Sequence, residues 1–362
     1  MNTTMAGLAL LAALPLQALA QDPALQLYGR LNIGLEDMRL RDSTTQDDAH
    51  LRRLSNYRSV IGVRGSADLG GGLQLLYQVE GTLSPDTGAG ALAARDTRIG
   101  LAGRWGTLFA GNWTTPYNSA TSGLDPFYPT TAGYMSIMGN GSAATADNVS
   151  DTTSFDRRQQ NSVHYWTPEW HGITLRLAHG LNEESPPNGA RPSLTSGALV
   201  FERGAWYAAL AHERHHAYRG PGLDDQGSKL GLAYRFGTLR VAAAVEQLRY
   251  ASAGGALARR SWYLSLSQQR GAHGIRFGVA MARDGKGDSS ERVGFIQAGP
   301  RSGAVHATLG YDYTLSKRTS LFVFHTRLDN RQRGAYDFAI NDLGADAGAT
   351  VSGTALGMRH AF

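Results

Sequence analysis

The chain has 362 residues, a formal net charge of +5, 45 glycines and no cysteine, and only 18% of its residues are charged. The absence of cysteine excludes disulfides, catalytic thiols and zinc–thiolate centres. Beyond the N-terminus no window approaches eighteen consecutive apolar residues, which argues against a bundle of transmembrane helices. The arginines are scattered rather than clustered, which argues against a nucleic-acid-binding surface.

The N-terminal segment has the pattern of a secretory signal peptide. Residues 1–20 have an apolar core and end in an A-x-A motif at positions 18–20. We predict cleavage before Gln21, so that the mature protein leaves the cytoplasm and residues 21–362 form the folded domain.

The first folded segment, residues 24–36 (ALQLYGRLNIGLE), alternates between apolar and polar side chains. Leucine and isoleucine occupy one parity, whereas Arg30 and Glu36 share the other. Successive side chains of a strand point to opposite faces, so the segment predicts a strand with one apolar face and one wet face.

The same alternation recurs along the chain, and Gly- or Asp-rich connectors join the segments in pairs. The further alternating segments include residues 73–83, 238–250, 262–268, 274–282, 305–313 and 320–328. The seven short connectors are residues 68–72, 103–106, 168–172, 202–205, 236–238, 269–274 and 315–319. The eight long polar loops are residues 40–56, 84–94, 112–158, 181–194, 216–227, 251–259, 284–303 and 329–349. Seven turns alternating with eight loops give sixteen strands.

Short turns at one end, long loops at the other and period-two polarity predict an all-β fold, a 16-stranded antiparallel transmembrane β-barrel. A closed barrel leaves no unpaired backbone edge in lipid. The apolar parity then faces acyl chains and the polar parity faces a lumen. Aromatic residues beside the short turns agree with an interfacial girdle: Trp105, Trp170, Trp206 and Phe236.

Several segments resemble one family. LYGRLNIGLE (27–36), IGVRGSADLGGGLQLLYQVEG (61–81) and IGLAGRWGTLFAGN (99–112) are similar to the first strand and the next two hairpins of the trimeric general porins of Gram-negative outer membranes, of the β-proteobacterial type. Residues 161–180, 313–330 and 357–362 match later family segments. The resemblance implies a homotrimer in the bacterial outer membrane, passive diffusion of small hydrophilic solutes and a third loop, residues 112–158, folded into the pore.

The resemblance also implies partners. In this family a terminal aromatic residue is read by the barrel-assembly machinery, which gives Phe362 the role of an assembly signal. The other expected partners are outer-membrane lipid and small polar solutes. No cofactor, metal or nucleic acid is expected.

Selectivity is expected to come from charges across the narrowed pore, because low-dielectric walls focus their field. Strand parity places seven such residues on the lumen wall: Arg30, Arg58, Arg64, Glu80, Arg98, Arg158 and His164. The third loop offers carboxylates that would face them: Asp125, Asp147, Asp151 and Asp156. Val60 and Asn112 stand where the family often has arginine, so we predict only a mild anion preference.

One motif indicates a different chemistry. His212-Glu213-Arg214-His215-His216 matches the H-E-x-x-H pattern of zinc proteases, which requires a helix so that both histidines share a face. Here the motif ends a predicted strand, along which the outer histidines would lie about 13 Å apart at roughly 3.3 Å per residue. No nucleophile and base stand out for an enzymatic barrel such as a lipase, so we expect no enzyme.

Two alternatives to a general diffusion channel remain: a channel specific for one substrate class, and a barrel that does not conduct. A substrate-specific channel for sugars or carboxylates would show stacked aromatic residues or a dense file of arginines along the lumen. A structural or adhesive barrel would have a plugged lumen and no conductance.

Overall fold

The computed structural model describes residues 25–45, 47–252 and 254–362, so the predicted signal peptide lies outside the described residues. Within these ranges the helices are α1 (Pro116–Ser122) and the 3-10 turn η1 (Tyr134–Ser136). Neither of these described helices is long and apolar enough to cross a membrane.

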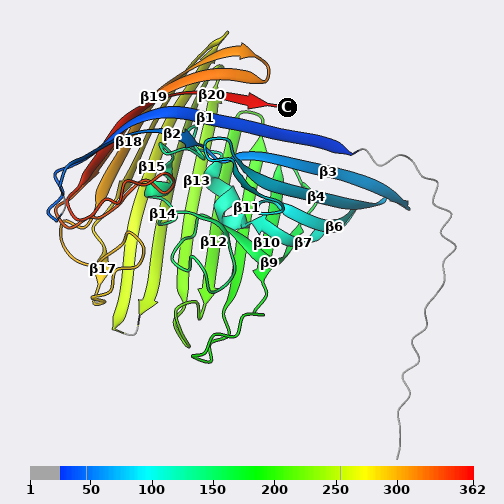
Figure 1. Cartoon of the computed structure of the whole chain (residues 1–362). Coiled ribbons are helices and arrows are strands. Elements are labelled where there is room, and N and C mark those ends of the chain that lie inside the picture. The colour runs from blue at the N-terminus through cyan, green and yellow to red at the C-terminus, as the bar shows by residue number, and fades with distance from the viewer. Residues whose placement is uncertain (1–24, 46, 253) are drawn as a thin grey trace, which may run out of the picture.

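The described strands form one sheet, antiparallel apart from the short β8, which pairs with β9 in parallel. The sheet closes on itself, because β1 pairs with β20 from Arg30–Ala361 to Arg41–Thr350. Figure 1 shows the red β20 beside the blue β1. In the described chain sixteen strands make the wall, with β2 and β3 as two parts of one strand. They are β1 (Gln26–Arg41), β2 (Ala49–Asn56) with β3 (Ser59–Gly70), β4 (Leu73–Ser84), β6 (Thr97–Gly103), β7 (Gly106–Thr114), β9 (Arg157–Trp166), β10 (Ile173–Gly180), β11 (Ser193–Arg203), β12 (Trp206–His216), β13 (Asp225–Phe236), β14 (Leu239–Ser252), β15 (Gly255–Arg270), β16 (His273–Ala282), β18 (Ala304–Ser316), β19 (Thr319–Asn330) and β20 (Thr350–Ala361). The prediction of a sixteen-stranded barrel is confirmed.

Three shorter strands lie in the loops: β5 (Ala89–Ala91), β8 (Ala143–Ala146) and β17 (Lys286–Gly287). The outward-facing side chains of the wall strands are mainly apolar, and Leu35, Leu199 and Leu264 are examples that are exposed. Each predicted girdle residue is exposed beside a short turn, which agrees with contact to the lipid interface.

Two of the predicted loops are wrong in extent. Residues 40–56 were expected to be a loop, but β1 and β2 pair from Ile33–Asn56 to Leu40–Ala49. Residues 251–259 were also expected to be a loop, but β14 and β15 pair as far as Ser252–Gly255. Polar residues do not mark the end of a strand here, because the wall extends past the apolar band and its far end meets water.

The long strand formed by β2 and β3 is interrupted at Tyr57 and Arg58. Arg58 has a φ of +55°, and the Tyr57 side chain turns inward, where its hydroxyl donates to Glu36 Oε1 at 2.8 Å. Both parts still pair with β1, so the break redirects side chains without opening the wall.

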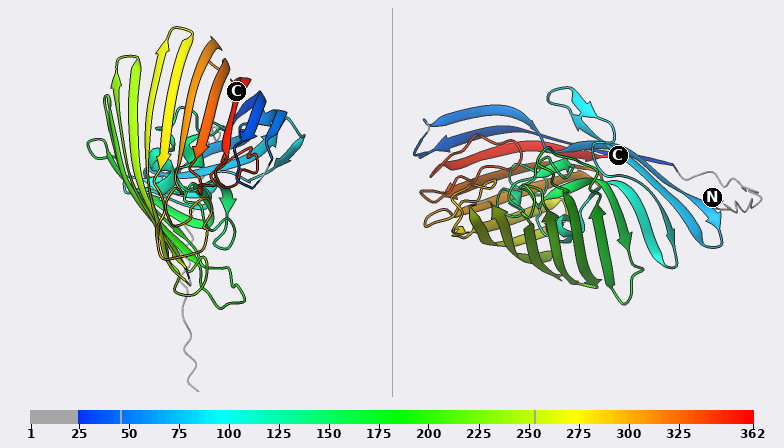
Figure 2. Two further views of the ribbon diagram at one scale, coloured as in Figure 1. Left: turned by 90° about the vertical axis from the view of Figure 1, so that its left-hand side faces the viewer. Right: turned by 90° about the horizontal axis from the view of Figure 1, so that it is seen from below.

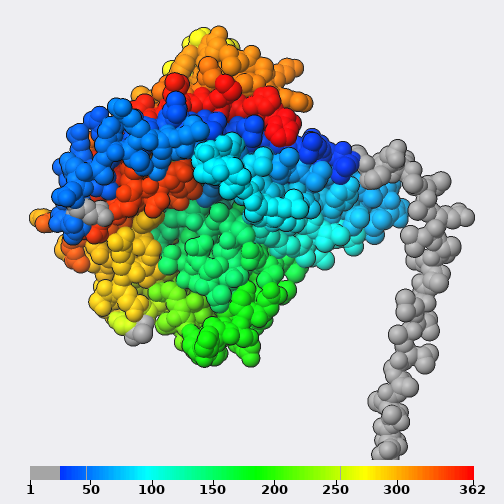
Figure 3. All heavy atoms as spheres, viewed as in Figure 1, coloured from blue at the N-terminus to red at the C-terminus, as the bar shows by residue number. Residues whose placement is uncertain are grey.

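The third loop, residues 115–156, folds into the barrel. Figure 2 shows its helix enclosed by the strands, and in Figure 3 teal-green atoms of this region fill the centre of the visible face. The wall under the loop carries buried alanines such as Ala233, Ala242 and Ala244, against which Leu124 and Phe127 pack. The inward side chains that the loop covers therefore include apolar ones as well as buried polar and charged ones such as Glu246 and Arg259, a mixture that periodicity alone did not predict.

Candidate functional site

The third loop begins with a capped helix. Thr115 accepts a hydrogen bond from the Asn118 amide at 3.3 Å, and Pro116 occupies the first helical position, where its missing N–H costs nothing. Gly231 on β13 lets the loop approach the wall, since a Cβ there would lie 2.7 Å from Leu124 Cδ1. The helix thus lies directly on the strands that it covers.

A buried ion pair anchors the middle of the loop. Glu246 Oε2 and Arg259 Nη2 lie 2.9 Å apart with both side chains fully buried. Glu246 also accepts from the Gly139 amide at 2.9 Å and from the Tyr117 hydroxyl at 2.8 Å, and Arg259 donates to the Ile137 carbonyl at 2.6 Å. Each charge therefore bonds both its partner and the loop, as a buried pair requires to offset its desolvation.

Asp125 makes a second anchor. Its carboxylate accepts from the Tyr263 hydroxyl at 2.6 Å and from the amides of Tyr134 at 2.7 Å and Phe127 at 2.9 Å. Burial in this loop raises the pKa of Asp125 to about 6. The expectation that Asp125 faces the arginines across the pore is wrong, because its carboxylate is buried against β15 and holds the loop.

Two of the other loop carboxylates, those of Asp147 and Asp156, also bond within the loop itself. Asp147 accepts from the amides of Val149 and Ser150 in a tight turn, at 2.9 and 2.6 Å. Asp156 is buried and accepts from the Ser142 hydroxyl at 3.0 Å. Asp151 is exposed, and thus differs from the buried Asp125 and Asp156.

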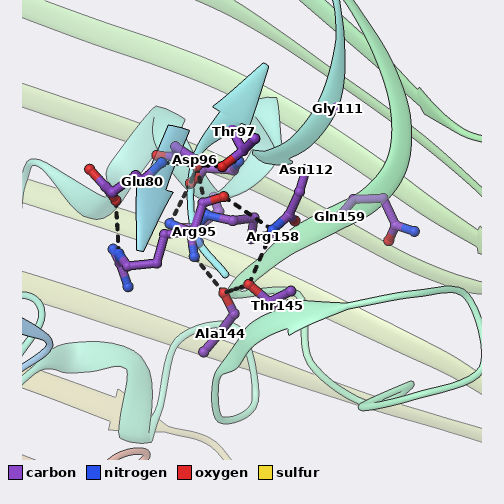
Figure 4. Close-up of polar contacts among 12 residues, drawn as sticks. Glu80, Arg95, Asp96, Thr97, Gly111, Asn112, Ala144, Thr145, Arg158 and Gln159 are labelled. Carbon is purple, nitrogen blue, oxygen red and sulfur yellow. Dashed lines mark hydrogen bonds and ion pairs between the residues drawn. The ribbon is translucent and has the colours of Figure 1, made fainter. Parts of the chain in front are cut away.

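Two predicted wall residues are neutralised by partners that the sequence analysis missed. Glu80 pairs with Arg95 at 2.8 Å, and Arg158 pairs with Asp96 at 2.6 Å, as Figure 4 shows. Arg158 also donates to the Ala144 carbonyl and is only 7% exposed. The signal for this network was the adjacent opposite charges at positions 95 and 96, where the second long loop meets the wall.

Arg98 and His164 lie in an aromatic cluster on the inner wall. The Arg98 guanidinium carbon is 4.3 Å from the ring centroid of Trp113 and 4.7 Å from that of Phe109. His164 stacks on Phe109 with centroids 4.7 Å apart, and its Nε2 lies 3.0 Å from Ser162 Oγ. His164 is only 1% exposed, so the expectation that it lines the open lumen is wrong. Its inward parity was correct, but neighbouring rings cover it.

Arg30 and Arg58 lie together on the inner wall. Arg30 donates to the Arg58 carbonyl at 3.0 Å, and Arg58 donates across to Ser142 of the third loop at 2.6 Å. Arg359 on β20 pairs in register with Asn32 of β1 and lies near enough to Arg30 for the two charges to interact. In the part of the chain that the structure describes, none of these three arginines forms an ion pair with a carboxylate.

A cationic vestibule lies between the third loop and the short turns. It is a cavity of about 520 Å³ whose lining includes Arg235, Arg240, Arg276, Arg359 and the carboxylate of Asp312. Asp312 pairs with Arg276, which leaves a positive excess. Arg240 and Arg276 also donate to loop carbonyls, those of Gly123 and Pro126. None of these four arginines was singled out from the sequence, although all four share the inward parity of their strands.

The remaining predicted residues lie near the short-turn end. Arg64 is exposed, donates to Gln26 at 2.9 Å and sits 4.9 Å from the Tyr28 ring centroid. Phe362 exchanges two backbone hydrogen bonds with Gly29, at 3.0 and 3.1 Å, so the last residue continues the seam between β20 and β1.

The H-E-x-x-H motif lies on β12, as predicted. His212 and His216 point outward and are exposed, whereas Glu213 and His215 point inward, are fully buried and lie 2.9 Å apart. Alternate residues of a strand face opposite ways, which separates the motif's two outer histidines from its glutamate.

The chain is similar to known outer-membrane proteins. A family model described as Gram-negative porin matches residues 7–333. Outer membrane porin protein 32 of Delftia acidovorans is 26% identical over 314 residues, which cover 84% of each chain. A solved anion-selective porin from Comamonas acidovorans is 23% identical, with a TM-score of 0.78 over 94% of this chain and all of that one. The trimer form of OmpT from Vibrio cholerae is 13% identical, with a TM-score of 0.66 over 94% of this chain and 99% of that one. These two structural likenesses concern the fold.

Proposed function

This chain belongs to the Gram-negative porin family, and from that premise we propose that it favours small anions mildly among the solutes that it passes. It is an outer-membrane channel for passive diffusion of small hydrophilic solutes. Porins are channels rather than enzymes, and the barrel needs no reaction chemistry for this role.

The observation that carries the anion preference is the excess of arginine on the inner wall. Arg30, Arg58 and Arg359 have no carboxylate partner among the described residues, and the vestibule adds Arg235 and Arg240. Such fixed charges attract counter-ions into a narrow, low-dielectric passage.

The preference is mild because other inner-wall charges cancel. Glu80, Asp96 and Asp312 each pair with one arginine, at 2.8, 2.6 and 2.5 Å. The anion selectivity named for the Comamonas acidovorans porin of similar fold supports the same sign.

The third loop is proposed to narrow the pore. The anchors at Glu246 and Asp125 support this proposal, because they hold a folded segment inside the barrel. The Arg58 contact to Ser142 joins the loop to the opposite wall. We propose that three residues farther from this contact also contribute to the electrostatic field in the pore: Arg64, Arg98 and Asp151.

A homotrimer is also proposed. The trimer form named for the OmpT structure supports it, and so does Leu92 in the second loop, which is 84% exposed in this single chain. We retain Phe362 as the assembly signal and residues 1–20 as the cleaved signal peptide, with outer-membrane lipid, the assembly machinery and small polar solutes as further partners.

A substrate-specific channel for sugars or carboxylates is not favoured. Stacked inward rings such as Phe109–His164 and Phe155–His215 are at most 2% exposed, so a passing solute does not reach their faces. Liposome-swelling rates test this choice. The account predicts rates that fall smoothly with solute size and do not saturate, and saturation by one solute class would contradict it.

A further inference from the structure

We propose that a patch of tryptophan and arginine side chains on the inner wall binds aromatic carboxylates and favours their passage over that of saturated carboxylates of similar size. The patch consists of Arg98, Trp113, Trp166 and Arg176, which lie on the adjacent strands β6, β7, β9 and β10 (Figure 1). This inference rests on the proposed function, because the channel remains a general one and the patch changes only the relative rates of its solutes.

Strand register places Arg98 across two rings. Phe109 and Trp113 lie two turns of the alternation apart on β7, with Gly111 between them, and their rings meet edge to face with centroids 5.2 Å apart. Gly111 pairs with Arg98 of β6 and has no side chain to fill the space between the rings. The Arg98 guanidinium carbon therefore lies 4.3 Å from the Trp113 ring centroid and 4.7 Å from that of Phe109.

Trp166 joins the two arginines of the patch. It pairs in register with Arg176 of β10, whose guanidinium carbon lies 5.2 Å from the Trp166 ring centroid. The Arg98 guanidinium carbon lies 5.5 Å from the same centroid. The rings of Trp113 and Trp166 also meet edge to face, with centroids 6.3 Å apart. Two cations and two indole rings thus form one continuous surface.

The patch is open to the lumen, unlike the ring behind it. All four of its side chains are half-buried, whereas Phe109 is only 2% exposed. The patch lies between the third loop and the short turns, because Trp113 almost directly precedes that loop and Trp166 pairs with Thr107 near the start of β7. A solute that has passed the third loop therefore meets these side chains.

The patch has donors that the protein does not use. Arg98 Nε and Nη1, Trp166 Nε1 and Arg176 Nε are buried and have no hydrogen-bond partner among the described residues. The carboxylate of Asp96 interacts electrostatically with Arg98, but it is already bonded to Arg158 at 2.6 Å. A buried donor without a partner costs free energy, so the patch favours a ligand that brings anionic oxygen atoms.

A benzoate-like anion fits both halves of the patch. Its carboxylate can bond a guanidinium group in bidentate fashion, and its ring can pack against an indole edge to face or with an offset. A saturated ring of similar size has the same charge but no π system, and an inorganic anion uses the arginines alone. Because the patch is open on one side, we expect brief retention rather than saturable uptake.

The test compares benzoate with cyclohexanecarboxylate in planar bilayers. With the sodium salt of one acid on each side at equal concentration, the reversal potential gives the ratio of the two permeabilities. We expect the benzoate-to-cyclohexanecarboxylate ratio to be roughly threefold higher in the wild type than in Trp113→Leu/Trp166→Leu, because an aromatic contact contributes about that factor beyond its buried area. The matched control, Trp105→Leu/Trp170→Leu, changes two outward girdle residues and should keep the wild-type ratio.

A second variant covers the case in which the leucine variant does not assemble. Arg176→Gln leaves both indole rings in place and should also lower the ratio, because the carboxylate then no longer holds the aromatic ring against them. Equal ratios in the wild type and in either of these variants would overturn this inference alone. A wild-type protein that never conducts would overturn the proposed function and this inference with it.

Discussion

Glu246 and Arg259 lie side by side on β14 and β15, 2.9 Å apart and closed off from solvent, and the middle of the third loop is bonded to both. Both residues belong to the wall, and each also bonds the loop, while Glu246 accepts a further hydrogen bond from Ser261 of β15 at 3.3 Å. This ion pair is therefore one of the buried anchors that position the loop, together with Asp125.

Replacing Arg259 with methionine should release the loop. The change leaves the Glu246 charge buried without its partner, which typically costs about 3–5 kcal/mol. We expect lower stability to urea in detergent and noisier, larger single-channel currents in planar bilayers.

The double variant Glu246→Met/Arg259→Met provides the control. It removes both charges, so it should be more stable than Arg259→Met alone while still losing the loop contacts. A quiet, wild-type current trace from Arg259→Met would show that the pair does not position the loop.

Asp125 should make stability depend on pH. Burial raises its pKa to about 6 in the folded protein, above the ordinary value of 3.8, so the folded state holds this proton more tightly than the unfolded state. Its contribution is therefore complete below about pH 4 and is lost as the pH rises through about 6. Relative to Asp125→Asn, the wild type should lose up to about 3 kcal/mol of unfolding free energy between pH 4 and pH 7. Parallel pH profiles of the two proteins in urea titrations would contradict this assignment.

Replacing Gly29 with alanine should impair assembly. A Cβ at Gly29 would lie 2.3 Å from Phe362 Cζ and 2.8 Å from the Val60 carbonyl oxygen, so the terminal ring would have to leave its place on β1. Overlap of this kind costs typically about 1–3 kcal/mol. The folded fraction, measured as the heat-modifiable band on a gel, should fall. Gly197→Ala, whose Cβ would meet Leu177 at 3.3 Å, is the control and should assemble normally.

Charge reversal at Arg30 should shift ion selectivity. Two units of charge at about 8 Å in water shift the energy of each ion by about 1 kcal/mol, in opposite directions for chloride and potassium. Screening with a Debye length of about 10 Å at 0.1 M salt roughly halves the combined effect, so Arg30→Glu should lower the chloride-to-potassium permeability ratio roughly fivefold. Arg158→Gln should change the ratio less, because Arg158 is buried and paired with Asp96. Equal shifts from the two variants would show that exposure and pairing do not decide which arginines matter.

The fold could be predicted because its main signal is local. Alternation along a segment such as Gln26–Glu36 reports which side chains meet lipid, and turn residues report where the chain reverses. Strand ends could not be predicted so well: β2 mixes polar and apolar residues on each face, and β15 starts with a run of small residues and leucine, so neither segment alternates clearly. Polarity alone does not distinguish such strands from loops.

For the site, the sequence predicted which side chains point inward but not which of them are covered. The alternation along each strand correctly predicted that four side chains point into the barrel: those of Arg30, Glu80, Arg98 and His164. It could not show which inward residues the third loop or a neighbouring ring would cover, since that depends on contacts between residues far apart in sequence. Asp125 and Tyr263, for example, are 138 positions apart, yet their hydroxyl–carboxylate bond is 2.6 Å long.

The central claim is that the inward-facing side chains of the strands line a water-filled passage whose wall has a net positive charge. The reversal potential of the wild-type channel in a planar bilayer, recorded across a potassium chloride gradient, tests it most directly. The account predicts discrete conductance steps and a potential whose sign shows chloride crossing more readily than potassium. A potential of the opposite sign would contradict the charge assignment, and a bilayer that never conducts would contradict the channel itself.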